Sequence, residues 1–321
     1  MAGSTRLPRY AYLGPAGTFT ETALRQVAGP DEAEYLPLVD VVSTLEAVRS
    51  GRADFAVVPI ENSVEGGVTA TLDTLATGEA LVLLREVLVP VTFVLAARPG
   101  IVLGDVTRVS THPHAWAQCR RWFKAILPAA LHVPSTSTAA AGALLADTEP
   151  GHDPGFEAVL VSPLSAELYG LEVLADHVAD NESAVTRFVV VGLPGAMSAP
   201  TGADKTSLVV HLPSNEAGAL LEMLEQFAAR GVNLSRIESR PLGDLLGRYS
   251  FSIDAEGHLA EERVAEALIG LHRVCPHVRF LGSYPRADGA ATDVRPGTAD
   301  ADFEGARRWV DALRAGDWPG T

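Results

Sequence analysis

The 321-residue sequence predicts an α/β protein built in two parts. Up to about residue 192, short apolar runs alternate with helical segments, which is typical of sheets that are mainly parallel. After a linker rich in Pro, Gly and Ala at residues 193–204, the order becomes β-α-β-β-α-β, the split pattern of a ferredoxin-like domain. Because 47% of the residues are hydrophobic and 20% are charged, the chain can bury substantial cores.

The first part predicts alternating strands and helices in chain order. Thr18 with Glu21, and Ser43 with Glu46, have the spacing of capping boxes, so we expect a helix to begin after each pair. Pro113 is placed to be the first residue of a helix that runs to about Leu127. We expect strands at residues 10–13, 53–58, 81–97 (a pair), 106–110, 131–133 and 157–161, with helices between them.

These elements fall into two blocks, residues 1–90 with 163–192 and residues 91–162, so the chain leaves the first block and returns to it. Two α/β lobes joined by two crossings form a cleft that can close over a ligand.

Polar side chains follow strand after strand in this part. In open α/β sheets, ligands bind at the carboxyl ends of strands, where helix N-termini present free N–H groups to anions. One serine or threonine at such a place is usually a helix cap, but five junctions of the same kind favour an anion-accepting cleft. The residues are Thr18, Asn62 with Ser63, Thr111, Ser135 to Thr138, and Ser162.

Composition and motifs exclude several classes of function. The formal net charge of −15 argues against a nucleic-acid partner. The sequence has no Gly-x-Gly-x-x-Gly and no Walker-type loop, so we expect no nucleotide, and His112 with His114 lack a third metal ligand nearby. The two cysteines, Cys119 and Cys275, are far apart, which is typical of reduced packing residues in a cytoplasmic protein.

Two further observations bear on location. The start of the sequence has no apolar core of a signal peptide. The longest apolar stretch, residues 80–97, contains Arg85, Glu86 and Pro90, so it predicts strands and not a membrane helix.

The second part spans residues 205–285. We expect strands at residues 205–212, 233–239, 248–254 and 278–284, and helices at residues 216–230 and 259–275. The tail, residues 286–321, has one short helix candidate at about 303–314, to which the sequence assigns no chemistry.

Several motifs together resemble those of one family. The segments YLGPAGTFTETAL, PIENSVEGGV, THPHAWAQC, STST and VTRF resemble, in order and spacing, the motif series of prephenate dehydratases. The segment GALLEMLEQFAARGVNLSRIESRP resembles the phenylalanine-binding ACT domain of that family. The resemblance covers about residues 9 to 285 and rests on six segments, any one of which alone is a weak signal.

The resemblance implies a fold and an activity. The catalytic domain, residues 1–192, is expected to resemble type II periplasmic-binding proteins, and residues 205–285 are expected to form the ACT domain. The activity is conversion of prephenate to phenylpyruvate with release of CO2 and water, without a cofactor, on the route to phenylalanine. The family forms homodimers or homotetramers in which ACT domains pair.

The resemblance also assigns roles to residues of the cleft. Thr186 is expected to hydrogen-bond the departing hydroxyl group of the substrate. Asn62, Thr111 and Gln118 match family positions that line the site, and a helix from Pro113 would bring Thr111 and Gln118 to one face. Thr18 and Ser137 are weaker candidates that are equally well explained as helix caps.

Arg187 has two open interpretations. It can pair with a substrate carboxylate in the bidentate manner of arginine. Neighbouring strand residues face opposite sides, however, so if Thr186 faces the cleft, Arg187 points away and ties the lobes together. Ala184 and Ser183 are a departure, because the family often has an asparagine two or three residues before the threonine; Ser183 or Asn181 are the residues that can replace it.

The resemblance places a phenylalanine site in the ACT domain, at an interface between two such domains, and predicts feedback inhibition by L-phenylalanine. Glu238 and Arg240 can equally be strand-end charges. Two alternatives stay open at this point: an arogenate dehydratase, and a ligand sensor of the same architecture without turnover. The expected phenylalanine-site residues are Gly218, Ala219, Leu220, Leu221, Asn233, Glu238, Ser239, Arg240 and Pro241.

Overall fold

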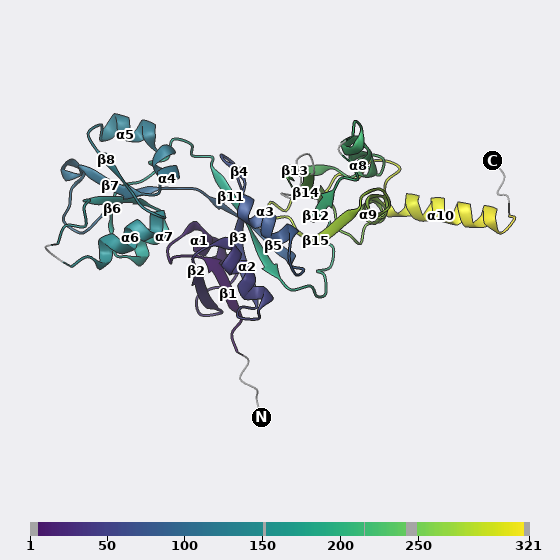
Figure 1. The fold of residues 1–321 in the computed structure, drawn as a ribbon, viewed down its shortest axis with the longest axis horizontal. Helices are drawn as coiled ribbons and strands as arrows, with labels where there is room; N and C mark the ends of the chain where they lie inside the picture. Colours follow the sequence, from purple (N-terminus) through teal and green to yellow (C-terminus); the bar gives the residue numbers. More distant parts are fainter. Residues whose placement is uncertain (1–5, 150–151, 215, 242–248, 318–321) are drawn as a thin grey trace, which may run out of the picture. The chain divides into compact units, whose positions relative to one another are not determined.

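The computed structural model describes residues 6–149, 152–214, 216–241 and 249–317 (Figure 1). The chain forms two compact units. The first unit comprises the chain up to Thr71 together with Val87–Val191, and the second comprises Leu72–Glu86 together with the chain from Gly192 onward. No helix in these described ranges is long and apolar enough to cross a membrane.

The first unit contains two lobes, each built on its own sheet. In the first lobe, the strand order is β2-β1-β3-β11-β5, and the short β4 pairs with β3. Strand β1 is parallel to β2 and β3, whereas β11 is antiparallel to β3. The elements are β1 (Arg9–Leu13), α1 (Phe19–Arg25), β2 (Glu34–Leu38), α2 (Val41–Arg49), β3 (Phe55–Asn62), β4 (Gly66–Gly67), α3 (Thr69–Ala76), β5 (Val82–Pro90) and β11 (Val185–Gly192).

The second lobe has the strand order β10-β6-β9-β7-β8. Strand β7 is parallel to β8 and β9, whereas β6 is antiparallel to β9. The elements are β6 (Val94–Ala97), the 3-10 helix η1 (Leu103–Asp105), β7 (Arg108–Thr111), α4 (Pro113–Ala117), α5 (Arg120–Ile126), β8 (Leu131–Pro134), α6 (Thr138–Asp147), β9 (Ala158–Val161), α7 (Pro163–Leu168) and β10 (Glu172–Ala175).

The two sheets repeat one arrangement. In each, three parallel strands are followed by the strand that has just entered from the other lobe, which runs antiparallel, and then by an edge strand. The entering strands are β6 and β11. The two crossings run together, because the amide of Val91 donates to the carbonyl of Ala184 and both residues are buried in one apolar cluster with Phe93 and Val178. The predicted two-lobed fold is therefore confirmed.

Three local predictions differ from the structure. We expected the chain to re-enter the first lobe at residue 163, but β10 stays in the second lobe as the edge strand beside β6. The expected helix from Pro113 to about Leu127 is broken at Gln118 and Cys119 into α4 and α5. Helix α2 begins two residues before the expected cap, because the Asp40 carboxylate accepts the Ser43 N–H at 2.7 Å.

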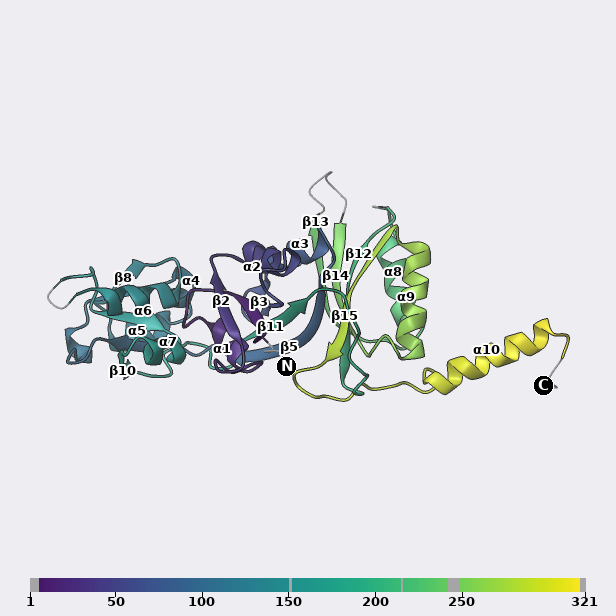
Figure 2. The same cartoon turned by 90° about the horizontal axis from the view of Figure 1, so that it is seen from below.

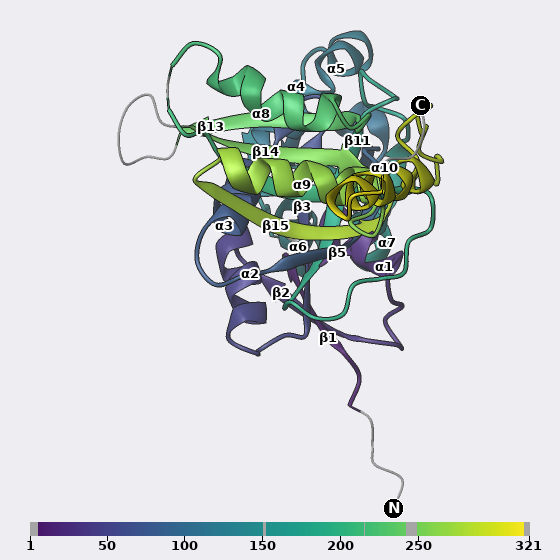
Figure 3. The ribbon, with the colours of Figure 1, turned by 90° about the vertical axis from the view of Figure 1, so that its right-hand side faces the viewer.

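The second unit has a four-stranded antiparallel sheet in the order β13-β14-β12-β15, with α8 and α9 packed side by side on one face (Figure 2). This is the predicted ferredoxin-like arrangement. Its core includes Leu208, Phe227, Ile253 and Leu271. The elements are β12 (Asp204–His211), α8 (Ala219–Ala228), β13 (Leu234–Pro241), β14 (Tyr249–Glu256), α9 (Glu262–Val274), β15 (His277–Pro285) and the tail helix α10 (Asp300–Arg314), seen nearly end-on in Figure 3.

The sequence placed residues 72–86 in the first lobe, and β5 is the edge strand of that lobe's sheet, but these residues pack with the second unit as well. The Lys205 ammonium lies 3.1 Å from the buried carboxylate of Glu86, and Arg279 donates to the Ala76 carbonyl at 3.0 Å. Gly282 makes the close approach possible, because a Cβ built on it would lie 2.4 Å from the Leu83 carbonyl oxygen. Local sequence patterns do not show such long-range packing.

Candidate active site

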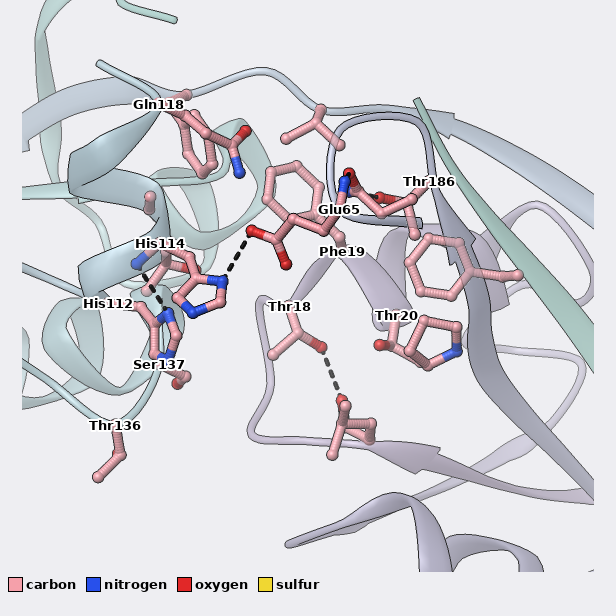
Figure 4. Close-up of a pocket in the computed structure, with 18 of the residues that line it drawn as sticks. Thr18, Phe19, Thr20, Glu65, His112, His114, Gln118, Thr136, Ser137 and Thr186 are labelled. Carbon is pink, nitrogen blue, oxygen red and sulfur yellow. Dashed lines mark hydrogen bonds and ion pairs between the residues drawn. The ribbon is translucent and has the colours of Figure 1, made fainter. Parts of the chain in front are cut away.

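A cleft of about 410 Å³ in the first unit is lined by residues of both lobes (Figure 4). The structure brings together in it five of the seven residues that the sequence proposed for catalysis or substrate binding. These five are Thr18, Asn62, Gln118, Ser137 and Thr186. The other two, Thr111 and Arg187, do not line the cleft.

Thr186 is held by its neighbour across the sheet. Strand β11 pairs with β3 so that Thr186 lies opposite Asn62, and the Asn62 side-chain amide donates to the Thr186 hydroxyl oxygen at 2.8 Å. The other end of that amide is fixed, because its oxygen accepts the N–H groups of Val64 and Glu65 at 2.8 and 3.2 Å. Since the Thr186 oxygen accepts from Asn62, its own O–H is left to donate, and Thr186 lines the cleft.

Arg187 lies on the opposite side of the same strand. It is 6% exposed and pairs in register with Glu61, whose carboxylate oxygen lies 3.6 Å from the guanidinium. Alternation along β11 therefore sends the hydroxyl of Thr186 to the cleft and the side chain of Arg187 away from it.

Thr111 is fully buried at the end of β7, and its hydroxyl donates to the Leu160 carbonyl of the adjacent strand β9 at 2.7 Å. The expected shared helix face with Gln118 does not form, because Thr111 belongs to the strand and the helix starts only at Pro113. Gln118 reaches the cleft as the residue that ends α4.

Three helix N-termini border the cleft. Thr18 caps α1 by accepting the Glu21 N–H, His112 caps α4, and Ser137 caps α6 by accepting the Ala140 N–H at 2.9 Å. Thr18 and Ser137 thus line the cleft and are helix caps at once. The remaining first-turn N–H groups of these helices carry partial positive charge, which suits anions. Among the described residues, no lysine or arginine lines the cleft.

Among the lining residues that the sequence did not propose are three titratable ones, Glu65, His112 and His114. The Glu65 carboxylate of the first lobe lies 2.7 Å from His114 Nδ1 of the second, across the cleft (Figure 4). The signal for Glu65 was its place in the polar segment that follows β3. The two histidines were considered only as metal ligands or packing residues, and no cluster able to hold a metal ion occurs among the described residues.

His112 has a defined neutral form. Its Nδ1 accepts the His114 N–H at 3.3 Å, so in the neutral ring the proton sits on Nε2. Burial lowers the pKa of His112, and the neighbouring His114 lowers it further. His112 is therefore a neutral ring with one N–H donor among the residues that line the cleft.

The lobes also meet away from the residues that line the cleft. Ser162 Oγ donates to the Gly17 carbonyl at 2.7 Å, and the Tyr169 hydroxyl donates to the Ala16 carbonyl at 2.9 Å. Gly17 has a φ of +84° and a Cβ there would lie 3.0 Å from Ser165 Cα, so this contact needs glycine. The loop before α1 is thereby attached to both ends of α7.

The residues expected to bind phenylalanine lie in two stretches of the second unit, which are largely exposed except at the buried Ala219. Gly218, with a φ of +98°, precedes α8, whose Leu220 and Leu221 are 40% and 59% exposed. The other stretch runs along the edge strand β13. There, Arg240 pairs with Asp73 at 3.1 Å, and Glu238 lies 3.8 Å from Arg236. The remaining residues of that stretch are Asn233, Ser239 and Pro241, which are exposed.

Comparisons with known proteins agree with this architecture. Residues 10–195 match the family model described as prephenate dehydratase. A prephenate dehydratase of Amycolatopsis methanolica is 46% identical over 97% of this chain and 99% of its own length, and one of Mycobacterium tuberculosis is 46% identical over 96% and 94%.

Solved structures are similar over the same length. A prephenate dehydratase of Arthrobacter aurescens, described in complex with L-Phe, superposes with a TM-score of 0.90 at 56% identity and covers 96% of this chain and 99% of its own. One from Staphylococcus aureus gives a TM-score of 0.72 at 27% identity, covering 86% and 99%. A protein described as a novel type of quorum quenching acylase gives 0.75 at 30% identity, covering 90% and 98%. The fold, the cleft and these similarities together show that the chain belongs to the prephenate dehydratase family.

Proposed function

We propose that this member of the family converts prephenate to phenylpyruvate, CO2 and water in the cleft, with Thr186 beside the departing hydroxyl group. The observation that carries the proposal is the Asn62–Thr186 pair. The amide donor of Asn62 fixes the threonine oxygen and leaves its O–H to donate to an oxygen in the cleft.

The binding of the substrate follows from the polar groups around that pair. Prephenate carries two carboxylates, and no lysine or arginine among the described residues lines the cleft. The donors are the N-termini of α1 and α6, the Gln118 amide and the Nε2–H of His112. The apolar side chains of Phe19, Phe93 and Phe188 form the wall against which a ring packs.

The reaction needs little from the protein beyond position and polarity. The bond between the ring and its carboxylate breaks to release CO2, its electron pair enters the ring, and the C–O bond of the hydroxyl opposite breaks. The ring becomes aromatic, which drives the step without a cofactor. A threonine hydroxyl is a weak acid, so its contribution is a hydrogen bond that strengthens as negative charge develops on the leaving oxygen. The released hydroxide takes a proton from solvent and ends as water.

Regulation and assembly are assigned to the second unit. We propose that L-phenylalanine binds between the start of α8 and the edge strand β13, at an interface between two copies, and inhibits the reaction. The exposed Leu220 and Leu221 offer apolar surface, and β13 is free to face another chain as an edge strand. The description of the Arthrobacter relative in complex with L-Phe supports this effector. Because the proposed site is shared between two copies, we also propose a homodimer or homotetramer.

A cytoplasmic location is also proposed. Both cysteines are free and buried, and burial raises the pKa of the Cys119 thiol to about 12, so neither is built as a disulfide or a nucleophile.

One assay tests the activity and its rivals together. The purified chain is mixed separately with prephenate and with arogenate, and the products phenylpyruvate and phenylalanine are followed. We expect kcat/KM to favour prephenate. A preference for arogenate would identify the aminated substrate as the natural one, and binding of either without product would indicate a sensor. An acyl-amide substrate serves as a third arm, because one structural relative is described as an acylase.

A further inference from the structure

The tail helix α10 lies outside the ferredoxin-like fold and has an apolar seam. Phe303, Ala306, Val310 and Leu313 recur at spacings of three, four and three residues, the pattern of the inner positions of a coiled coil. No residue of the helix is buried. In the seam, Ala306 and Val310 are exposed, whereas Phe303 and Leu313 are half-buried, and the neighbouring Trp309 is 55% exposed. This is an amphipathic helix whose apolar seam is only partly covered within the described chain.

The helix is fixed to the second unit along one side. The Arg307 guanidinium forms ion pairs with Glu262 and Glu266 of α9, the second at 2.8 Å, and these two carboxylates raise the pKa of Arg307. The Asp300 carboxylate accepts the Glu262 N–H at 2.8 Å. Helix α10 follows β15 and begins near the start of α9, and Figure 2 shows it extending from there with no other drawn helix or strand along it. Phe303, Ala306 and Val310 of the seam line a hollow together with Arg307 and Glu266, so the seam lies next to the side of α10 that α9 holds.

The charges of α10 are divided between its ends. Its first half carries Asp300, Asp302 and Glu304, whereas Arg307, Arg308 and Arg314 lie in its second half, where Asp311 is the one acidic residue. An antiparallel partner with the same sequence meets acidic with basic residues at both ends, whereas a parallel one aligns like charges. We infer that α10 pairs with the α10 of a second copy of this chain, antiparallel and about a two-fold axis.

The seam fits such a pair in one register. Phe303 packs against Leu313 of the second copy, and Ala306 packs against Val310, so a small residue faces a larger one in each inner layer. Asp300 then lies beside Arg314 of the second copy. The two Trp309 side chains meet at the axis. The two Arg307 side chains also approach each other there, but each is neutralised by Glu262 and Glu266 of its own α9.

The contact is too short to hold two chains together alone. Two heptads of helix form a weak coiled coil in isolation, so the pairing acts together with a second interface, which raises the effective concentration of the helix ends. The inference concerns assembly and does not depend on the reaction in the cleft.

Cysteine cross-linking tests the arrangement in the full chain. Trp309→Cys places a thiol at the proposed axis. The matched control is Arg308→Cys, which places a thiol on the preceding residue, whose side chain is 73% exposed on the outer side of the helix. The native cysteines are buried, so background cross-linking is low. Under mild oxidation at low protein concentration, we expect covalent dimer to form about tenfold faster for Trp309→Cys than for Arg308→Cys.

A second substitution distinguishes specific pairing of the two α10 helices from cross-linking by random collision of two chains. Adding Val310→Lys to Trp309→Cys puts a charge in the seam, and we expect the cross-linking rate to fall to that of Arg308→Cys, with the circular dichroism spectrum unchanged. If Trp309→Cys gives no covalent dimer, forms one no faster than Arg308→Cys, or is insensitive to Val310→Lys, the proposed pairing is wrong.

Discussion

Two polar pairs meet at the same turn of the chain and differ in almost every physical respect. Asn62 and Thr186 lie opposite each other on adjacent strands of one sheet, and Thr186 is 8% exposed. Glu65 and His114 belong to different lobes, and their side chains are 46% and 63% exposed. The Asn62 side chain also accepts the Glu65 N–H, so one short turn carries a member of each pair.

The two pairs therefore suit two different roles, one in the reaction and one in the opening and closing of the cleft. A hydrogen bond between neighbouring strands stays in place when the lobes move, which suits a group that must keep its position during a reaction. A contact between two exposed side chains is worth at most about 1 kcal/mol, so it can form and break as the cleft closes and opens. We therefore expect substitutions in the first pair to change kcat and substitutions in the second to change KM.

The largest effect is expected at Thr186. Thr186→Ala removes the hydroxyl that faces the leaving oxygen, so kcat should fall by about 10²–10³ with little change in KM. Thr186→Ser keeps the hydroxyl and should retain more activity than the alanine variant. Both are measured by phenylpyruvate formation from prephenate. A Thr186→Ala variant with nearly wild-type kcat would remove Thr186 from the mechanism.

A substitution of Arg187, the next residue of β11, should affect stability and leave kcat nearly unchanged. Arg187→Met should lower the free energy of unfolding by about 1–3 kcal/mol, because Glu61 loses its partner on the far side of the strand. We expect kcat to stay within about threefold of wild type, since the guanidinium does not line the cleft. Urea unfolding and steady-state kinetics on the same preparation check both. A large loss of kcat without a loss of stability would restore Arg187 as a substrate ligand.

A substitution of Asn62 tests whether the reaction needs the amide that donates to Thr186. Asn62→Asp keeps an oxygen for the Val64 and Glu65 N–H groups but loses the donor to Thr186, so kcat should fall by about threefold to tenfold, the value of one hydrogen bond. Asn181→Asp is the matched control, because Asn181 also accepts a backbone N–H, from Ser183, and does not line the cleft. Equal kcat in both variants would contradict the proposed role of Asn62.

The exposed pair should show a smaller effect of a different kind. Glu65→Gln weakens the contact to His114, so KM for prephenate should rise by less than about fivefold. Glu149→Gln is the control, because Glu149 also pairs with an exposed histidine, His152, outside the cleft. A large change in kcat for Glu65→Gln would assign the carboxylate to the chemistry.

The sequence predicted those features of the two pairs that depend on the residue pattern within one strand or one turn. Strand β11, its entering threonine and the polar segment after β3 are visible in the residue pattern, and the family resemblance assigned Thr186 its role. For Arg187 the sequence left two interpretations open, and one of them was that strand alternation points its side chain away from that of Thr186. Local order is enough here because both neighbours lie on one strand.

The rest depends on contacts between distant segments. Thr111 has the composition of a cleft residue, but its hydroxyl is taken by the carbonyl of Leu160, 49 residues away. The partner of Glu65 is a histidine of the other lobe, and the packing of residues 72–86 with the second unit depends on Lys205 and Arg279. Hydrophobic period and capping signals carry no information on such pairs.

The smallest expected effect concerns His112 and the pH dependence of the free energy of unfolding. Burial lowers its pKa in the folded chain, whereas the unfolded chain has the ordinary value of about 6.5. The unfolded state therefore takes up the proton first, so the stability that the neutral ring contributes is complete above about pH 6.5 and is lost as the pH falls through the lower folded value. His112→Asn keeps a side-chain oxygen that can accept the His114 N–H but does not titrate. Urea unfolding at pH 7.5 and pH 5 should thus show wild type losing stability relative to His112→Asn at the lower pH. A difference that stays constant between the two values would mean that His112 does not titrate on unfolding, and the neutral donor proposed for the cleft would lose its support.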